Sequence, residues 1–175
     1  PGIKASQIAA RLGDGGAGLV AVERDPGRAS ELAELLERTG TSRAEVVNAD
    51  ATEPAPDSGF DAVLVDPPCS GLGTLASRPD ARWRRQPDDI ASMASLAASI
   101  LARGLEAARP GGRVVYSTCT ISRAENEEVA LGAGAAVEDL GAGHQELATP
   151  HDHRFLQTRP DRDRTDGFFI AALRA

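Results

Sequence analysis

Apolar positions along the chain follow two patterns, short continuous runs and longer stripes with helical spacing. Continuous runs of aliphatic and β-branched residues predict strands that are covered on both faces. They lie at 19–23, 44–47, 60–65, 112–118 and 167–173, with a weaker signal at 136–140. Stripes with a spacing of three and four residues predict helices within 1–12, at 28–38, from 87 to about 109, and at 122–131. This alternation predicts an α/β fold with a mostly parallel, doubly wound sheet.

The ends of the predicted helices carry recognisable signals. Pro87 and the two acids after it open the long helix, because proline suits the first turn and acids favour the positive end of the helix dipole. Pro110 and the glycines after it end that helix. Ser122, with Glu125 three residues later, fits a capping box that opens a helix running to Leu131.

The chain opens on a helix rather than on a strand, and a glycine-rich turn follows at 13–18. A doubly wound sheet normally has a strand before its first helix. We therefore expect that first strand to lie upstream of Pro1 and to be missing from the chain. The sequence shows neither an internal repeat nor a clear linker, so we expect residues 1–175 to form a single domain.

Composition narrows the class of protein. Apolar residues make up 41% and charged residues 26% of the chain, as in an ordinary soluble globular protein. The apolar runs are shorter than the roughly 20 residues of a membrane span, so we expect no membrane partner. Two cysteines without the spacing of a secreted scaffold indicate free thiols and a reducing compartment, hence the cytoplasm.

Charge is unevenly distributed along the chain. The net charge of −7 argues, on bulk charge alone, against a protein that binds nucleic acid. Four arginines, however, cluster around Trp83: Arg78, Arg82, Arg84 and Arg85. Local potential at a site matters more than the sum over the chain. Arg78, Arg82 and Trp83 are therefore candidate contacts for a nucleic acid, and a merely solvated arginine surface is the alternative.

Both cysteines follow predicted strands. The strand at 60–65 ends in Asp66, two prolines and Cys69, and prolines cannot continue a sheet ladder. The strand at 112–118 ends directly before Cys119. Two strands of one parallel sheet place both thiols at the same edge, which is where open α/β sheets bind their ligands. Asp66, Cys69 and Cys119 are therefore the candidate catalytic residues.

Three acids close three successive strands: Glu23, Asp50 and Asp66. A carboxylate at such a strand end is well placed to accept hydrogen bonds from ribose hydroxyls. Pro1 and Gly2 precede a helix N-terminus, which suits a close approach to a charged cofactor. A second glycine pattern for a pyrophosphate is absent, so the sequence favours S-adenosylmethionine over a dinucleotide.

Several of these motifs resemble one family of enzymes. Asp-Pro-Pro-Cys-Ser-Gly at 66–71 and Ser-Thr-Cys-Thr at 117–120 resemble the two cysteine motifs of RNA cytosine-5 methyltransferases of the RsmB/Nop2/Sun family. The start at 1–4, the segment 78–83, the pair at 125–126 and the closing strand at 166–169 also look like that family. The resemblance implies a Rossmann-like, S-adenosylmethionine-dependent methyltransferase domain, here a catalytic fragment that acts on RNA.

The resemblance also implies roles for particular residues. Cys119 would attack carbon 6 of cytosine, Cys69 would assist release of the methylated product, and Asp66 would contact the base or the cofactor. S-adenosylmethionine would be held by residues at the strand ends and at the start of the chain, namely Pro1, Gly2, Ile3, Lys4, Glu23, Asp50 and Asp66. The RNA would be rRNA or, as an alternative, tRNA, and the enzyme would be a monomer that needs no metal.

The chemistry is consistent without the family. Carbon 5 of cytosine is a poor nucleophile, and addition of a thiolate at carbon 6 activates it. A group that protonates or hydrogen-bonds ring nitrogen 3 stabilises the developing charge, and a base must then remove the proton from carbon 5. One carboxyl group and two thiols suffice for these steps. The base must also be unstacked to be reached.

Other interpretations stay open. The thiols could be small buried residues or a redox pair, and we interpret the cluster at 151–153 as a polar loop rather than a metal site. An amino-group methyltransferase of RNA, DNA or protein also begins this motif with Asp-Pro-Pro, but it normally ends in an aromatic residue where Cys69 stands. A non-catalytic methyltransferase-like module is the third class, since Ile3 replaces a glycine of the family's cofactor loop.

Overall fold

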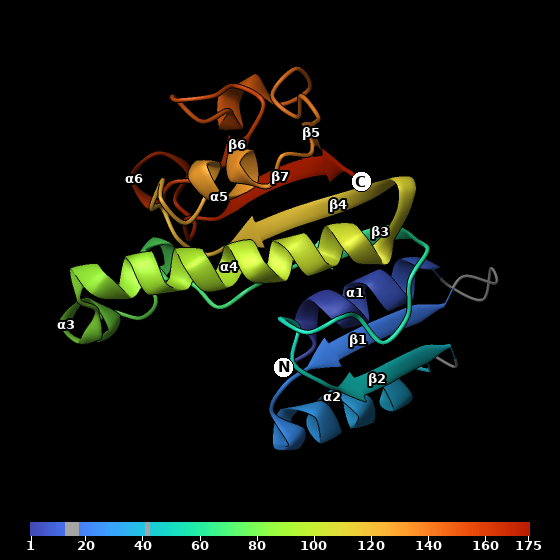
Figure 1. Ribbon diagram of the computed structural model, residues 1–175. Helices are drawn as coiled ribbons and strands as arrows, with labels where there is room; N and C mark the ends of the chain where they lie inside the picture. The colour runs from blue at the N-terminus through green and yellow to red at the C-terminus, as the bar shows by residue number, and fades with distance from the viewer. Residues whose placement is uncertain (13–17, 41–42) are drawn as a thin grey trace. The chain divides into compact units, whose positions relative to one another are not determined.

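The computed structural model describes residues 1–12, 18–40 and 43–175 of the chain. It forms two compact units, Pro1–Pro56 and Asp57–Ala175 (Figure 1). Each unit has a sheet and a hydrophobic cluster of its own. Most of the glycine-rich turn predicted at 13–18 lies outside the described residues. The expectation of a single domain stays a prediction.

The N-terminal unit consists of two parallel strands and two helices. Its elements are α1 (Ile3–Leu12), β1 (Leu19–Glu23), α2 (Pro26–Arg38) and β2 (Ala44–Asn48). Along the parallel pair, Leu19 lies opposite Ala44 and Glu23 lies opposite Asn48. The apolar stripes of the helices are buried in a small cluster that contains Ala9, Leu32 and Leu36. These elements confirm the helix–strand–helix–strand order that the sequence predicts.

Helix α2 begins two residues before its predicted start because Asp25 caps it. The Asp25 carboxylate accepts a hydrogen bond of 2.8 Å from the Arg28 backbone N–H. Pro26 occupies the first turn, where its missing N–H leaves no bond unmade. Thr39 caps the other end, where its N–H bonds the Leu35 carbonyl at 3.1 Å.

The C-terminal unit holds the remaining elements. They are β3 (Phe60–Val65), α3 (Ala81–Arg84), α4 (Pro87–Ala107), β4 (Ala108–Thr118), α5 (Glu127–Gly132), β5 (Ala136–Val137), β6 (Leu156–Gln157), α6 (Pro160–Asp163) and β7 (Phe169–Arg174), with 3₁₀ turns at Leu72–Thr74 and Gln145–Leu147. Strands β3, β4 and β7 and helix α4 confirm the predicted elements. The short elements α3, β6 and α6 have no clear signal in the sequence.

The sheet of this unit is mixed. Its strand order is β3-β4-β7-β5, and β6 also pairs with β7 (Figure 1). β3 and β4 run parallel, whereas β7 runs antiparallel to β4, β5 and β6. The connection from β6 to β7, residues 158–168, contains the short helix α6, and the two strands pair antiparallel. The expected parallel pairing is present at β1–β2 and β3–β4. The expectation is wrong for β5, β6 and β7, which pair antiparallel.

Helix α4 covers β3 and β4. Its stripe buries Ala97 and Leu101 against Val65 and Val114 of the two strands. By length and composition α4 is the one helix among the described residues that meets the test for a membrane span, with a mean hydropathy of 1.2. Its buried stripe against the sheet is that of a covering helix.

Three predicted element bounds are wrong. Helix α5 begins at Glu127 instead of Ser122, because the Glu125 side chain turns into the core and forms no capping box. The chain enters β4 at Ala108, before the expected Gly112, and the register against β3 shifts between Phe60 and Ala62. The weak strand expected at 136–140 is shorter, because only Ala136 and Val137 pair with β7.

Candidate active site at the ends of β3 and β4

The two thiols meet at the carboxyl edge of the parallel pair. β3 and β4 are neighbours in register, with Val65 opposite Tyr116. Cys69 follows β3 after the two prolines, and Cys119 follows β4 directly. Their sulfur atoms lie 3.4 Å apart, within hydrogen-bond distance, and both side chains are partly buried. The prediction that the two strands bring the thiols to one edge is confirmed.

The two thiols differ in their protonation. The hydrogen bond with Cys119, followed by burial, raises the pKa of Cys69 well above the usual range of a thiol. The Cys69 thiol is therefore protonated at neutral pH, with its sulfur 3.4 Å from that of Cys119.

A buried carboxylate holds the residues that follow the thiols. Glu125 is fully buried, and its Oε1 accepts a bond of 2.6 Å from the Ser70 backbone N–H. Its Oε2 accepts from the Ser70 hydroxyl at 2.6 Å and from the Thr120 hydroxyl at 3.2 Å. The two hydroxyl oxygens lie 2.8 Å apart. We call Glu125, Ser70 and Thr120 the carboxylate clasp.

Further buried side chains fix the clasp. The Asn126 amide donates to the Thr120 carbonyl at 2.9 Å and accepts from the Thr118 hydroxyl at 2.6 Å. The Tyr116 hydroxyl donates to the Glu125 carbonyl at 2.5 Å, and burial raises the pKa of Tyr116, which stays protonated. Sequence reasoning missed these roles. The one signal was the pair at 125–126, which follows the second cysteine motif as it does in the family.

Gly73 brings a third segment against Cys119. Its N–H donates to the Cys119 carbonyl at 3.1 Å, and its own carbonyl accepts from the Gly167 N–H at 2.8 Å. A Cβ at position 73 would lie 2.0 Å from the Gly167 carbonyl oxygen and 2.9 Å from that of Cys119. Only glycine allows this approach, which packs the turn after Cys69 against the chain that enters β7.

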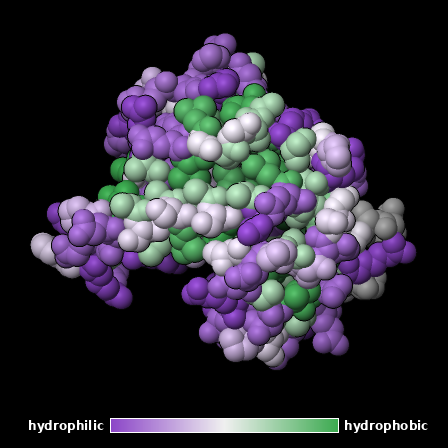
Figure 2. All heavy atoms as spheres, in the orientation of Figure 1, coloured by the Kyte–Doolittle hydropathy of each residue, from purple (hydrophilic) through white to green (hydrophobic). Residues whose placement is uncertain are grey.

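Asp66 and the arginine cluster lie in the same unit as the thiols. Asp66 is exposed directly after β3, three residues before Cys69. Arg85 connects the cluster to the thiol loop, since its Nε donates to the Ser70 carbonyl at 2.9 Å. On α3, Trp83 is 78% exposed, and the Arg82 guanidinium lies over its ring at 5.0 Å. Figure 2 shows hydrophilic side chains gathered over α3. Arg78 is exposed in the segment before α3.

The remaining predicted cofactor residues lie in the N-terminal unit. Glu23 is the last residue of β1, and Asp50 comes two residues after the end of β2. Both acids therefore lie at the carboxyl ends of the parallel pair, as expected of acids at successive strand ends. Glu23 accepts from the Asp25 N–H at 3.0 Å and from Arg28 Nε at 3.2 Å. Hydrogen bonds from the Thr52 backbone and hydroxyl lower the pKa of Asp50, so its carboxylate is ionised at neutral pH.

The start of α1 packs closely against α2. Gly2 has a φ of +90°, and a Cβ there would lie 2.7 Å from the Leu32 side chain. Pro1 and Lys4 flank the first turn of α1. Ile3 is 73% exposed, so its side chain points to solvent and does not crowd the helix. These residues and the thiols belong to different units, and that both sets bind one cofactor stays a prediction.

The polar cluster at 151–153 forms a loop. Asp152 pairs with Arg154, whose hydrogen bond lowers the pKa of that carboxyl. His153 lies 3.3 Å from Asp139. Among residues 1–12, 18–40 and 43–175, the His, Cys, Asp and Glu side chains form no group that could hold a metal ion.

The chain is similar to methyltransferases of known structure and sequence. Two solved structures from Pyrococcus horikoshii are each 28% identical: NSun6 solved with SFG, at a TM-score of 0.86 over 99% of this chain and 45% of that one, and a methyltransferase homolog protein, at 0.80 over 99% and 58%. The ribosomal RNA small subunit methyltransferase F of Salmonella heidelberg is 37% identical over 99% of this chain and 38% of its own length. The chain thus spans about two fifths of that relative.

The fold is therefore the Rossmann-like α/β fold of S-adenosylmethionine-dependent methyltransferases. The model of the family described as 16S rRNA methyltransferase RsmB/F matches residues 1–174. The chain belongs to this family, as the two cysteine motifs predict.

Proposed function

We propose that this chain is the catalytic part of an S-adenosylmethionine-dependent RNA cytosine-5 methyltransferase that acts on rRNA. The observation that carries the proposal is the pair of thiols 3.4 Å apart at the ends of adjacent parallel strands. Membership of the RsmB/F family, and the ribosomal RNA named for its relatives, support the substrate. The proposed chemistry uses thiol and carboxyl groups and calls for no metal.

Cys119 is the proposed nucleophile. Its thiolate adds to carbon 6 of the cytosine, and the electrons of the 5,6 double bond make carbon 5 nucleophilic. S-adenosylmethionine, when bound, supplies an electrophilic methyl group to carbon 5. Cys119 follows β4 directly and carries the second cysteine motif, to which the family resemblance assigns the nucleophile.

Cys69 is the proposed base that releases the product. Once the Cys119 sulfur is bonded to carbon it no longer carries charge beside Cys69, so the pKa of Cys69 falls and its proton passes to solvent. Cys69 then takes the proton from carbon 5, the double bond reforms, and the bond from carbon 6 to sulfur breaks. Cys119 leaves as a thiolate.

Asp66 is proposed to stabilise the base in the same steps. It follows β3 at the strand edge that carries both thiols, and it is exposed. A carboxylic acid that hydrogen-bonds or protonates ring nitrogen 3 draws charge from the ring when the thiolate adds. An alternative role, which the family resemblance leaves open, is contact with the cofactor.

The donor set of the N-terminal unit fits S-adenosylmethionine. Glu23 and Asp50 offer carboxylate oxygens to ribose hydroxyls at one edge of β1–β2. Gly2 precedes the N-terminus of α1, and the N–H groups and positive dipole end of a helix N-terminus suit a charged cofactor. We propose that Pro1, Ile3 and Lys4 complete this end of the site.

The exposed surface of α3 is proposed to bind the RNA. Trp83 offers a flat face for base stacking, and Arg82 and Arg78 add positive charge. Trp83→Ala is expected to weaken RNA binding about tenfold, in line with the loss of one stacked base. Filter binding at fixed salt measures the change, and Trp83→Phe should restore most of it. Unchanged affinity in Trp83→Ala would leave α3 without a role in RNA binding.

We also propose that the protein works in the cytoplasm and as a monomer. The nucleophile must be a free thiol, and a reducing compartment keeps two sulfurs at 3.4 Å from joining as a disulfide. Sedimentation velocity of the full-length gene product tests the monomer, and a concentration-dependent dimer would contradict it.

A trapping experiment tests the reaction. The full-length gene product with Cys69→Ala, S-adenosylmethionine and 16S rRNA is expected to give a protein–RNA band that survives denaturing electrophoresis. Adding Cys119→Ser should remove the band, and Cys119→Ser alone should lower methyl transfer by at least about 1,000-fold. A parallel reaction with tRNA separates the two candidate RNAs.

Product analysis separates the remaining classes. Nuclease digestion and mass spectrometry of the wild-type product should give 5-methylcytidine. A base methylated on an amino group, with activity kept in Cys119→Ser, would establish the amino-group methyltransferase instead. Failure to bind S-adenosylmethionine by calorimetry would favour the non-catalytic module.

A further inference from the structure

The carboxylate clasp joins the two thiol-bearing segments through the residues next to the thiols. Ser70 follows Cys69, and Thr120 follows Cys119, 50 residues further along the chain. Glu125 receives hydrogen bonds from both, at 2.6 Å from the Ser70 N–H, 2.6 Å from its hydroxyl and 3.2 Å from the Thr120 hydroxyl. One carboxylate therefore bonds the residues that follow both thiols, and the two hydroxyls also contact each other at 2.8 Å.

The surroundings make Glu125 a rigid anchor. Its side chain is fully buried, as are Ser70 and Thr120. Its backbone is held on both sides, because its N–H donates to the Ser122 carbonyl at 3.1 Å and its carbonyl accepts from the Tyr116 hydroxyl at 2.5 Å. Tyr116 belongs to β4 and is itself fully buried. The hydrogen bond from Tyr116 thus fixes the Glu125 backbone to strand β4 of the sheet.

We propose that Glu125 is a positioning residue for the thiol pair, which sets the distance from Cys69 to Cys119 through Ser70 and Thr120. The catalytic meaning of this distance rests on the function proposed above. A displacement of about 1 Å at a reacting group is enough to lower a rate strongly. The thiol distance itself can be measured without any methyl transfer.

A carboxylate suits this task better than a neutral side chain. Ionised oxygens accept shorter and stronger hydrogen bonds than neutral ones, and two oxygens receive three donors in the clasp. Replacement by glutamine keeps an oxygen for the Ser70 N–H, and its amide can still donate to the two hydroxyls. Alanine removes every contact. We therefore expect partial function in Glu125→Gln and a large loss in Glu125→Ala.

The first readout is the effective concentration of one thiol toward the other. The full-length gene product is equilibrated with reduced and oxidised glutathione, so that Cys69 and Cys119 lose two electrons and two protons while one glutathione disulfide becomes two glutathiones. Alkylation and mass spectrometry of the two peptides give the oxidised fraction. Glu125→Ala is expected to lower the effective concentration at least about tenfold, and Glu125→Gln about threefold.

Glu127→Ala is the matched control. Glu127 is two residues away and 3% exposed, so it is nearly as buried, but it contributes no contact to the clasp. In Glu127→Ala the effective concentration of one thiol toward the other should stay within about twofold of the wild type, as long as the variant is folded. Urea unfolding of every variant shows whether it is folded under the assay conditions. If Glu125→Ala does not fold, Glu125→Gln and Ser70→Ala carry the test.

The second readout is steady-state methyl transfer. A positioning role lowers kcat about tenfold in Glu125→Ala, with KM values for RNA and S-adenosylmethionine unchanged within about threefold. Glu125→Gln should recover part of kcat. An effective concentration and a kcat in Glu125→Ala that both match Glu127→Ala would overturn the proposal. If the wild type transfers no methyl group but the effective concentration still falls in Glu125→Ala, the proposed function fails and the positioning role stands.

Discussion

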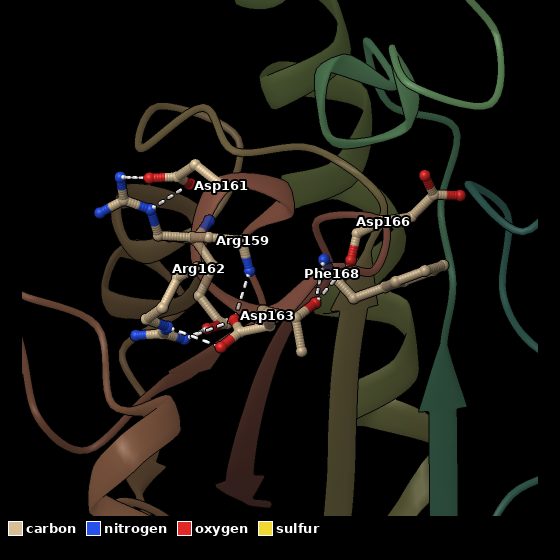
Figure 3. Close-up of polar contacts among 8 residues, drawn as sticks. Arg159, Asp161, Arg162, Asp163, Asp166 and Phe168 are labelled. Atoms are coloured by element: carbon tan, nitrogen blue, oxygen red, sulfur yellow. Dashed lines mark hydrogen bonds and ion pairs between the residues drawn. The ribbon is translucent and has the colours of Figure 1, made fainter.

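Two carboxylate networks of the C-terminal unit use the same kind of group in opposite surroundings. In the clasp, the buried Glu125 accepts from Ser70, 55 residues away in sequence, and from Thr120. On α6 and the residue before it, the exposed Asp161 pairs with Arg159 at 2.7 Å (Figure 3). The clasp joins two strand ends, whereas the second network joins residues that are already neighbours in the chain.

In the surface network, each carboxylate is bonded by arginines that lie within a few residues of it in the chain. Arg162 donates to both oxygens of Asp163 at 2.8 Å, and the Arg159 N–H donates to the same carboxylate at 2.7 Å (Figure 3). Water competes for each of these groups, so such pairs add little to stability. The lesson is that burial and sequence separation, and not the number of hydrogen bonds, decide what a network controls.

The largest effect is expected where the clasp region is packed most tightly. Gly73→Ala places a Cβ 2.0 Å from the Gly167 carbonyl oxygen, and backbone must move to accommodate it. We expect the free energy of unfolding to fall by about 4 kcal/mol. Urea denaturation measures it, with Gly132→Ala as the control, since nothing lies within 4 Å of a Cβ there. Equal stability of the two variants would contradict this account of Gly73.

Glu125→Ala is expected to come next. The change leaves the Ser70 N–H buried without an acceptor and opens a small cavity, so unfolding should become easier by about 2 kcal/mol. Asp163→Ala is the matched change in the surface network, and thermal unfolding should show a much smaller shift of its Tm. A larger shift in Asp163→Ala would reverse the comparison.

The thiol pair beside the clasp and the surface network respond to opposite ends of the pH scale, and the thiol pair responds to base. The folded pKa of Cys69 lies above its ordinary value of 9.0, so its contribution to stability is fully present below pH 9.0 and is lost as pH rises above it. Relative to Cys69→Ala, the wild type should lose about 1 kcal/mol between pH 9 and pH 10. Urea unfolding under reducing conditions tests this, and parallel curves for both proteins would contradict it.

The surface network responds to acid, and here the expected effect is smallest. The Arg162 hydrogen bonds lower the pKa of Asp163 below its ordinary value of 3.8, so its contribution is present above pH 3.8 and is lost as pH falls through the lowered value. Asp163→Asn should therefore lower the Tm slightly at pH 7 and not at all at low pH, where both proteins carry a neutral group. A Tm difference that persists at low pH would assign the effect to packing.

Much of the fold follows from local pattern. The runs at 60–65 and 19–23 are strands with the predicted bounds, because apolar runs between turn signals have few other structures open to them. The helix over 87–107 follows from its stripe and its proline start. Local pattern misled at Ser122 and Glu125, because a capping box and a residue that turns into a core share one spacing.

The sequence by itself determined which residues carry the chemistry. Two strands that end in cysteine, with an acid before the first, are visible as text, and parallel pairing brings their ends to one edge. Only the tertiary structure decided the distance between the thiols, which of them keeps its proton, and that Ser70 and Thr120 share one carboxylate. These depend on contacts between residues 50 and 55 positions apart and on burial. Local periodicity contains neither the long-range contacts nor the burial, because both arise only when the strands pack.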